Sequence, residues 1–244
     1  MATVSPAQRQ KPVAGQPLGA HAGPGLSGSA ALGILITGFD AFGEHRDQGD
    51  NPSARAAWAL HGQSLDGHPI EAVCLPTQFT AARRDLLELL QRPWALVLCV
   101  GQAGGRAAIG LERVAINVND ARIADNAGQQ PVDEPVVAGG PNAYFSTLPL
   151  KACVQALKAA GLPAEVSNTA GTFVCNHVFY SLMHALAQHT GRPAVPAGFV
   201  HLPWMPEQGK PSLPLADMTQ ALRLIAQTTL LTPNDLRLPG GKIS

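Results

Sequence analysis

Short apolar runs alternate with longer stretches of helical periodicity from residue 33 onward. The apolar runs have the length of buried strands, and the run at 94–100 contains apolar residues only. The stretches between them repeat apolar residues three and four positions apart, which is typical of helices that pack one face against a sheet. The pattern therefore predicts strands and helices in alternation.

The expected strands lie at 33–38, 70–75, 94–100, 111–118, 164–168 and 197–202, and the expected helices at 51–61, 80–91, 148–160, 175–189 and about 215–229. Strands separated by helices of this length need right-handed crossovers between parallel neighbours. The run at 94–100 suits a sheet covered on both faces. We predict an α/β fold, a single-domain three-layer α/β/α sandwich around a mostly parallel twisted sheet.

The first thirty residues differ in composition from the rest. Gly and Pro supply nine of these positions, and no aromatic residue occurs among them. Such a segment buries too little apolar surface to fold, and its glycines and prolines interrupt every candidate signal-peptide core. We predict a disordered arm at 1–30 and one folded domain at 31–244.

The charge balance excludes several partners. Lys and Arg number 17 against 17 Asp and Glu, so the formal net charge is zero. Binding to nucleic acid or to an anionic membrane surface needs a basic excess, and no apolar run approaches the eighteen residues of a membrane span. The four cysteines form no C-x-x-C pair. We expect reduced thiols and a cytoplasmic location.

Three loops follow expected strands, at 37–43, 101–106 and 168–177. Ligands of open α/β sheets bind at the carboxyl ends of strands, so these loops are the places to search. The glycine-rich loop at 101–106 lacks the Lys-Ser/Thr of a P-loop and the spacing of a dinucleotide fingerprint. A tight turn, or amides that bind a neutral ligand, explains it better than a phosphate site.

Cys175 is the cysteine placed for nucleophilic chemistry. It follows a glycine-containing turn at the start of an expected helix, where the helix dipole favours the thiolate and lowers the pKa of the thiol. Cys74 and Cys99 fall within expected strands and Cys153 within a helix, where a thiol acts as a small core hydrophobe.

A cysteine nucleophile needs an imidazole base, and His201 is the best placed of the eight histidines. It ends an expected strand at the same rim as Cys175. His177 follows Cys175 by two helical positions and therefore points elsewhere, and His184 lies on the face of His177. The histidines of this helix lack a metal-binding pattern such as H-E-x-x-H, so we expect no metal.

Glu112 is the candidate that orients the imidazole. It stands in an apolar strand after the glycine-rich loop, where a carboxylate must be paired. A purely structural ion pair with Arg113 or Arg122 is the alternative that composition alone leaves open.

The motifs TGFDAFG with NPS, GQAGGR, LERVAINVNDARIADN, AGTFVCNHVFY and GFVHLPWMPEQ, in this order, resemble those of pyroglutamyl peptidase I, the pyrrolidone-carboxylate peptidases. The resemblance covers about 33–230 and implies that the α/β/α sandwich is of the phosphorylase/hydrolase-like kind. It implies an intracellular cysteine exopeptidase that removes N-terminal pyroglutamate from peptides without metal or organic cofactor. It implies nucleophile Cys175, base His201 and orienting Glu112, with Arg122 and the Cys175 backbone N–H stabilising the oxyanion. Family members often form dimers or tetramers, so we expect a homo-oligomer.

The expected pocket suits a compact, uncharged lactam, which needs apolar walls and a few neutral hydrogen-bonding groups. Phe39, Phe42 and Phe173 lie in the strand-end loops and are candidates to close on the ring, with ordinary core packing as the alternative for each. The backbone around Gln102 is the candidate for the lactam carbonyl. A charged α-amine would be desolvated there, so ordinary N-termini should be rejected.

Two departures from the family pattern concern loops. Ala41 and Ala124 stand where the family usually has proline, and the loop 44–50 is longer than usual. Loss of a loop proline costs about 0.4–1 kcal/mol of stability when the backbone geometry is kept. The alternative functions are a non-hydrolytic binder of pyroglutamyl-blocked peptide ends and a nucleoside phosphorylase on a related sheet. A binder has no reason to keep Cys175, His201 and Glu112.

Overall fold

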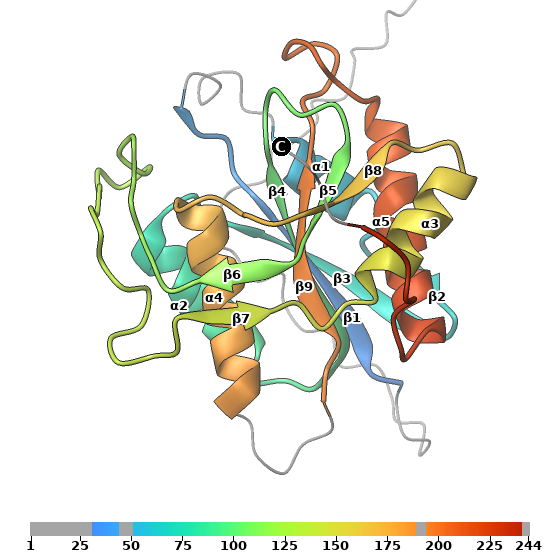
Figure 1. Ribbon diagram of the computed structural model, residues 1–244, viewed down its shortest axis with the longest axis horizontal. Helices are drawn as coiled ribbons and strands as arrows, with labels where there is room; N and C mark the ends of the chain where they lie inside the picture. The colour runs from blue at the N-terminus through green and yellow to red at the C-terminus, as the bar shows by residue number, and fades with distance from the viewer. Residues whose placement is uncertain (1–30, 44–50, 189–193, 241–244) are drawn as a thin grey trace, which may run out of the picture.

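A computed structural model describes residues 31–43, 51–188 and 194–240 (Figure 1). The predicted arm at 1–30 and the long loop at 44–50 lie outside these ranges. The strands are β1 (Gly33–Phe39), β2 (Ser64–Leu65), β3 (His68–Leu75), β4 (Trp94–Gln102), β5 (Ile109–Glu112), β6 (Val114–Ile116), β7 (Ala143–Phe145), β8 (Ala164–Ser167) and β9 (Ala197–Leu202). The helices are α1 (Pro52–Trp58), α2 (Phe79–Leu89), α3 (Leu150–Ala159), α4 (Val174–Gln188) and α5 (Leu215–Leu231).

The central sheet has seven strands in the order β2-β3-β1-β4-β9-β5-β8. Strands β3, β1, β4 and β9 run parallel, with β4 and β9 at the centre. Strand β5 pairs antiparallel with β9 and parallel with β8, so β5 and β8 run against the other long strands. The sheet is thus mostly parallel, as predicted.

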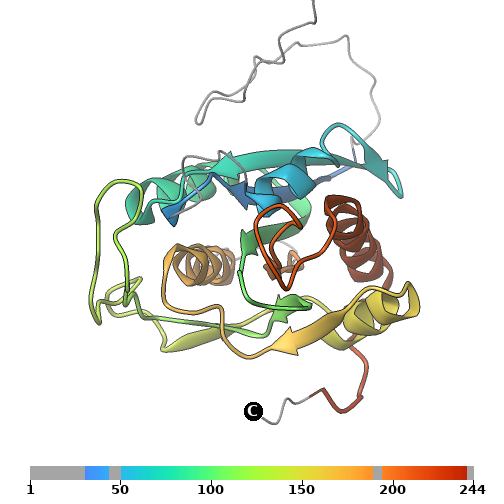
Figure 2. The same cartoon turned by 90° about the horizontal axis from the view of Figure 1, so that it is seen from above.

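Helices cover both faces of this sheet (Figure 2). One apolar core gathers side chains of α1, α3 and α5, and the other gathers side chains of α2 and α4. Alternate residues of β4 enter the two cores: Leu98 and Val100 face the first, and Val97 and Cys99 face the second. This alternation decides which side of the sheet each functional side chain faces. The three-layer α/β/α prediction is confirmed.

Asn51 begins α1 as the sequence predicts. Its side-chain oxygen accepts a hydrogen bond from the Ser53 N–H at 3.0 Å, and Pro52 occupies the first helical turn. A cap of this kind typically stabilises a helix by about 1 kcal/mol. The Ser53 hydroxyl in turn accepts from the Phe39 N–H at 3.0 Å, which joins the start of α1 to the end of β1.

The single strand predicted at 111–118 is wrong. The chain bends at Arg113, whose N–H donates to the Ser167 carbonyl and whose carbonyl accepts from Ser146, at 2.8 and 2.9 Å. Both backbone groups are therefore used by other segments, and β5 stays in the central sheet while β6 pairs with β7 in a separate ribbon. Strands β2 and β7 are too short for periodicity to reveal. Within the described ranges, no helix combines the length and apolarity needed to cross a bilayer.

Candidate active site

His201 lies between two glycines of the central sheet. It is the fifth residue of β9, where Gly101 of β4 is its register partner on one side and Gly110 of β5 on the other. His201 is 4% exposed and its ring lies 4.9 Å from the Phe199 ring, centroid to centroid. The two missing side chains leave room on both sides of the imidazole for groups that come from elsewhere in the chain.

Glu112 ends β5 on the same face of the sheet as His201. Its side chain has no exposed surface, and its Oε1 accepts a hydrogen bond from His201 Nδ1 at 2.7 Å. Strand β5 runs antiparallel to β9, so Gly110 is the register partner of His201 and Glu112 is the register partner of Phe199. Glu112 therefore lies two residues further into the sheet than Gly110. An ionised Glu112 fixes the tautomer with the proton on Nδ1 and leaves Nε2 to accept a proton.

Arg106 is the cation that pairs with Glu112. Its Nη1 lies 2.8 Å from Glu112 Oε1, the oxygen that also binds His201. The predicted alternatives, Arg113 and Arg122, form no ion pair with Glu112. Arg106 lies in the motif GQAGGR, but the sequence pattern assigns it no role, because it stands six positions before Glu112 across a turn with no helical periodicity. The available signal was a basic residue shortly before an apolar strand that contains a single carboxylate.

Cys175 is the second residue of α4, and its sulfur lies over Gly101. A methyl group at Gly101 would lie 2.8 Å from Cys175 Sγ. The nucleophile candidate therefore occupies the space beside His201 that Gly101 leaves open.

Burial, followed by the negative charge of Glu112, raises the pKa of the Cys175 thiol to about 12, and the positive charge of Arg106 opposes this shift. The sequence prediction of a lowered pKa is therefore wrong for the unliganded site. Desolvation of the sulfur outweighs the favourable field at the helix start. The thiol is protonated at neutral pH, so its proton must be taken up during attack.

The next two residues after Cys175 fix the start of α4. Asn176 is fully buried and bonds to the β6 backbone: its Oδ1 accepts from Ile116 N–H, and its Nδ2 donates to the carbonyls of Ile116 and Val118, at 2.9–3.0 Å. His177 Nδ1 lies 2.9 Å from Asn119 Oδ1 and thus points away from Cys175, as predicted. These hydrogen bonds join the first turn of α4 to β6 and to the residues that follow β6.

The loop that carries Arg122 is tied at both ends to the loops around the site. Asp120 N–H donates to the Thr172 carbonyl and the Thr172 hydroxyl donates to the Asp120 carbonyl, at 3.0 and 2.7 Å. Asn126 Nδ2 donates to the Ala41 carbonyl at 2.9 Å. Arg122 itself is exposed and forms no hydrogen bond or ion pair within the described ranges.

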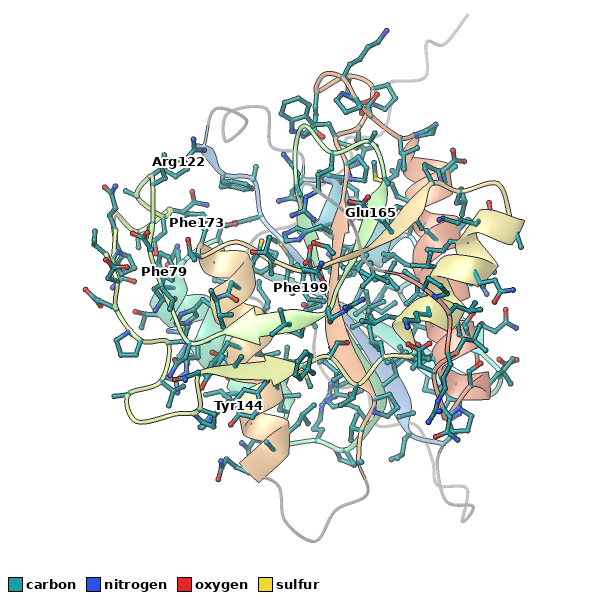
Figure 3. All side chains as sticks on the ribbon, in the orientation of Figure 1. Phe79, Arg122, Tyr144, Glu165, Phe173 and Phe199 are labelled. Atoms are coloured by element: carbon teal, nitrogen blue, oxygen red, sulfur yellow. The ribbon has the colours of Figure 1, made fainter. Side chains whose placement is uncertain are left out.

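Aromatic side chains form a wall beside this loop. The Phe42 and Phe173 rings are half-buried with centroids 6.1 Å apart, and the Phe79 ring packs edge-on against Phe173 at 5.4 Å. Figure 3 shows Phe79, Phe173 and Arg122 on one side of the molecule, with Phe199 at the centre of the sheet. Phe39 is only 2% exposed and packs in the core against Phe199.

The Gln102 side chain lies on the opposite face of the sheet from Cys175. Gly101 faces Cys175, so the next residue of β4 faces the other core, where Gln102 Oε1 accepts from Gln208 Nε2 at 3.5 Å. Only the backbone of Gln102 can therefore reach a ligand beside the sulfur.

A cavity of about 810 Å³ lies behind the aromatic wall, between α2, the start of α4 and the loop 119–136. Phe79 and His177 line it, whereas Cys175 and His201 do not. In the described part of the chain, no three His, Cys, Asp or Glu side chains come together as a metal site would require.

The fold and site define a class: a single-domain α/β/α protein in which a cysteine, a histidine and a buried carboxylate lie on one face of the central sheet. The sequence profile of the pyroglutamyl peptidase family matches residues 32–231. A pyrrolidone-carboxylate peptidase of Cupriavidus taiwanensis is 53% identical over 217 residues, which cover 86% of this chain and 98% of the relative. The chain belongs to the pyroglutamyl peptidase family of cysteine-type hydrolases.

Solved structures agree with this assignment. The crystal structure of pyroglutamyl peptidase I from Bacillus amyloliquefaciens is 44% identical with a TM-score of 0.80, covering 85% of this chain and 99% of that one. The pyrrolidone carboxyl peptidase from Thermococcus litoralis is 31% identical, also with a TM-score of 0.80, covering 86% of this chain and all of that one.

Proposed function

We propose that this protein is a cysteine exopeptidase that hydrolyses the bond after an N-terminal pyroglutamyl residue. The observation that carries the proposal is the buried Glu112–His201 pair at 2.7 Å, beside the glycine over which the Cys175 sulfur lies. A nucleophile, a base and a group that orients the base are the parts that acyl transfer needs. Membership of the family supports the substrate class.

The first stage forms a thioester. Cys175 Sγ attacks the pyroglutamyl carbonyl carbon while His201 Nε2 takes the thiol proton, and His201 then protonates the leaving amine as the C–N bond breaks. Because burial raises the pKa of the Cys175 thiol, the thiol needs a base to take up its proton in this stage. Glu112 stabilises the imidazolium that forms.

The second stage releases the product. Water attacks the thioester carbonyl, gives one proton to His201, and the C–S bond breaks. The proton returns from His201 to Cys175 Sγ, and free pyroglutamate leaves. The site returns to its starting protonation state without a cofactor.

The oxyanion of each stage needs hydrogen-bond donors aimed at it. The Cys175 N–H belongs to the first turn of α4, whose amides have no partner within the helix. Arg122 is exposed on a loop tied to Thr172, three residues before Cys175. We assign the oxyanion to these two donors.

The lactam ring of the substrate is assigned to the aromatic wall. Phe42 and Phe173 are half-buried and offer ring surface to a ligand, whereas Phe39 is buried and packs against Phe199 within the core. The backbone of Gln102, at the end of β4, supplies the polar contact to the lactam. An uncharged lactam ring packs against these aromatic side chains at a lower desolvation cost than a charged α-amine would.

The test is release of a fluorophore from a pyroglutamyl amide under reducing conditions, beside the matching prolyl and glutamyl amides. We expect cleavage of the pyroglutamyl compound only, lost after iodoacetamide treatment and in Cys175→Ser. Cys74→Ser is the matched control, because Cys74 is also partly exposed but lies in β3, away from His201. Cys74→Ser should keep wild-type activity.

A folded, reduced protein that binds a pyroglutamyl peptide without cleaving it would contradict the proposal. That result would favour the alternative, a non-hydrolytic binder of pyroglutamyl-blocked peptide ends. A cytoplasmic location and a homo-oligomeric state, dimer or tetramer, stay predictions. Light scattering after size-exclusion chromatography measures the second of these directly.

A further inference from the structure

We propose that Arg106 is a positioning residue, which holds the Glu112 carboxylate against His201 and joins it to the loop that leads into Cys175. The inference rests on the proposed function. It goes beyond the triad, because Arg106 touches neither the sulfur nor the imidazole in any hydrogen bond of the described residues.

The first observation is that one carboxylate oxygen carries both bonds. Glu112 Oε1 accepts from His201 Nδ1 at 2.7 Å and from Arg106 Nη1 at 2.8 Å, whereas the buried Oε2 has no hydrogen-bond partner in the described ranges. The rotation of the carboxylate is therefore set by the bonds on Oε1. Loss of Arg106 would leave His201 as the sole side chain that orients Glu112.

The second observation is that Arg106 also bonds to the segment before the nucleophile. Its Nη2 donates to the Thr169 carbonyl at 3.3 Å and its Nη1 lies 3.4 Å from the Ser167 hydroxyl. Ser167 ends β8, and Thr169 lies in the loop 168–173 that runs into α4. The planar guanidinium can bind a carboxylate and a carbonyl in one fixed geometry, which an ammonium does less well.

The third observation is that the sheet leaves space for this guanidinium. Gly110 of β5 lies beside Glu112, and a methyl group there would lie 2.9 Å from Arg106 Nη1. Arg106 is 29% exposed at its side chain, while Glu112 is fully buried. A buried carboxylate needs a compensating charge, and His201 supplies none while it is neutral.

The charges that face Cys175 also point to a role for Arg106. Glu112 from β5 and Cys99 from β4 raise the pKa of the Cys175 thiol, and Arg106 lowers it. His201 of β9 is the register partner of Gly101, over which the Cys175 sulfur lies. Loss of the Arg106 charge would therefore lower the thiolate fraction at a given pH and slow alkylation of Cys175.

The experiment compares Arg106→Gln and Arg106→Lys with Arg113→Gln. Arg113 is the matched control because it lies next to Glu112 in the chain but bonds to the Gly240 carbonyl. A correctly placed base contributes about 10²–10⁴-fold to the rate. We expect Arg106→Gln to lower kcat at least tenfold with KM changed less than threefold, Arg106→Lys to recover part of the loss, and Arg113→Gln to match wild type.

Two further measurements separate positioning from folding and from substrate chemistry. Thermal unfolding of each variant shows whether the fold is kept, and mass-spectrometric rates of iodoacetamide labelling at Cys175 at pH 8 need no substrate. We expect slower labelling in Arg106→Gln. Should Arg106→Gln fail to fold, Arg106→Lys is compared with Arg113→Gln, and lower kcat at an unchanged melting temperature supports the proposal.

Wild-type kcat and labelling rates in folded Arg106→Gln would overturn the proposal, as would Arg106→Lys no more active than Arg106→Gln. Failure of the proposed function is a different outcome: wild-type protein would then cleave no pyroglutamyl amide, while the labelling comparison would still test Arg106.

Discussion

At the scale of single residues, the site depends on two glycines, which have no side chain and so leave space beside His201. Gly101 and Gly110 flank His201 on the two neighbouring strands, and each leaves space for one functional group. The Cys175 sulfur fills the first space and the Arg106 guanidinium fills the second. The glycines therefore place a nucleophile and a cation around a base that is itself rigidly held in the sheet.

Gly101→Ala tests this arrangement. The new methyl group would lie 2.8 Å from Cys175 Sγ and 2.9 Å from Phe199 Cζ, which forces the sulfur away from His201. We expect kcat/KM to fall by about a hundredfold, because displacement of about 1 Å at a reacting atom has this effect. Steady-state kinetics measure it. Gly161→Ala, distant from the site, controls for general strain, and equal kinetics in both variants would contradict the assignment of Gly101.

Glu112→Gln separates an orienting carboxylate from a structural one. The amide keeps the shape of the side chain but removes the charge that stabilises the imidazolium of His201. We expect kcat to fall much more than KM rises, because the interaction strengthens only as the imidazolium forms. Steady-state kinetics on the pyroglutamyl amide give both constants. An unchanged kcat would reduce Glu112 to a partner in an ion pair.

At the scale of elements, the loop between β6 and β7 fastens α2 and α4 to each other. Asp125 accepts the Phe79 N–H of the first turn of α2 at 2.8 Å, although α2 has no cap of its own. The same carboxylate accepts two further amides, from Ala127 and Gln129. Phe79 in turn packs against Phe173 and His177 near the start of α4. One buried carboxylate thus supports the aromatic wall from behind.

Asp125→Ala removes this remote cap. Three buried or partly buried N–H groups would lose a charged acceptor, so we expect the free energy of unfolding to fall by about 2–4 kcal/mol. Chemical denaturation measures the loss. Asp120→Ala is the control, because the Asp120 side chain is exposed on the same loop. Comparable destabilisation by both changes would show that Asp125 has no special role.

Periodicity predicted the long elements well and the short ones poorly. The residues of β1, β4 and α4 carry their apolar patterns over six or more positions, so their structure is visible locally. The break at Arg113 is set by hydrogen bonds to Ser146 and Ser167, which are 33 and 54 positions away in the numbering. A local pattern of apolar and polar residues cannot indicate hydrogen-bond partners so far away in the chain.

At the scale of the whole molecule, buried titratable groups limit the pH range of stability. His177 is buried, and burial together with Arg83 lowers its pKa from 6.5 to about 4. All four thiols have a pKa raised from 9.0 to about 12, chiefly by burial. The folded protein therefore resists both protonation of His177 and ionisation of its cysteines.

The sign of each effect follows from linkage. Below pH 6.5 the unfolded chain protonates His177 before the folded one does, so stability falls as pH decreases toward 4; above pH 9 the unfolded thiols ionise first, so stability falls as pH rises toward 12. For these groups we expect a plateau between about pH 6.5 and 9, measured by urea unfolding under reducing conditions. His177→Gln should weaken the acid slope, and an unchanged slope would contradict the assignment to His177.

The sequence by itself determined the α/β/α architecture, the helix-start position of Cys175 and the strand-end position of His201, because apolar periodicity, glycines and caps act over a few residues. Tertiary structure decided that β5 runs antiparallel to β9 and that Arg106, not Arg113 or Arg122, pairs with Glu112. It also decided that burial raises the pKa of Cys175. Strand register and desolvation arise from residues far apart in the chain, so a local pattern carries neither.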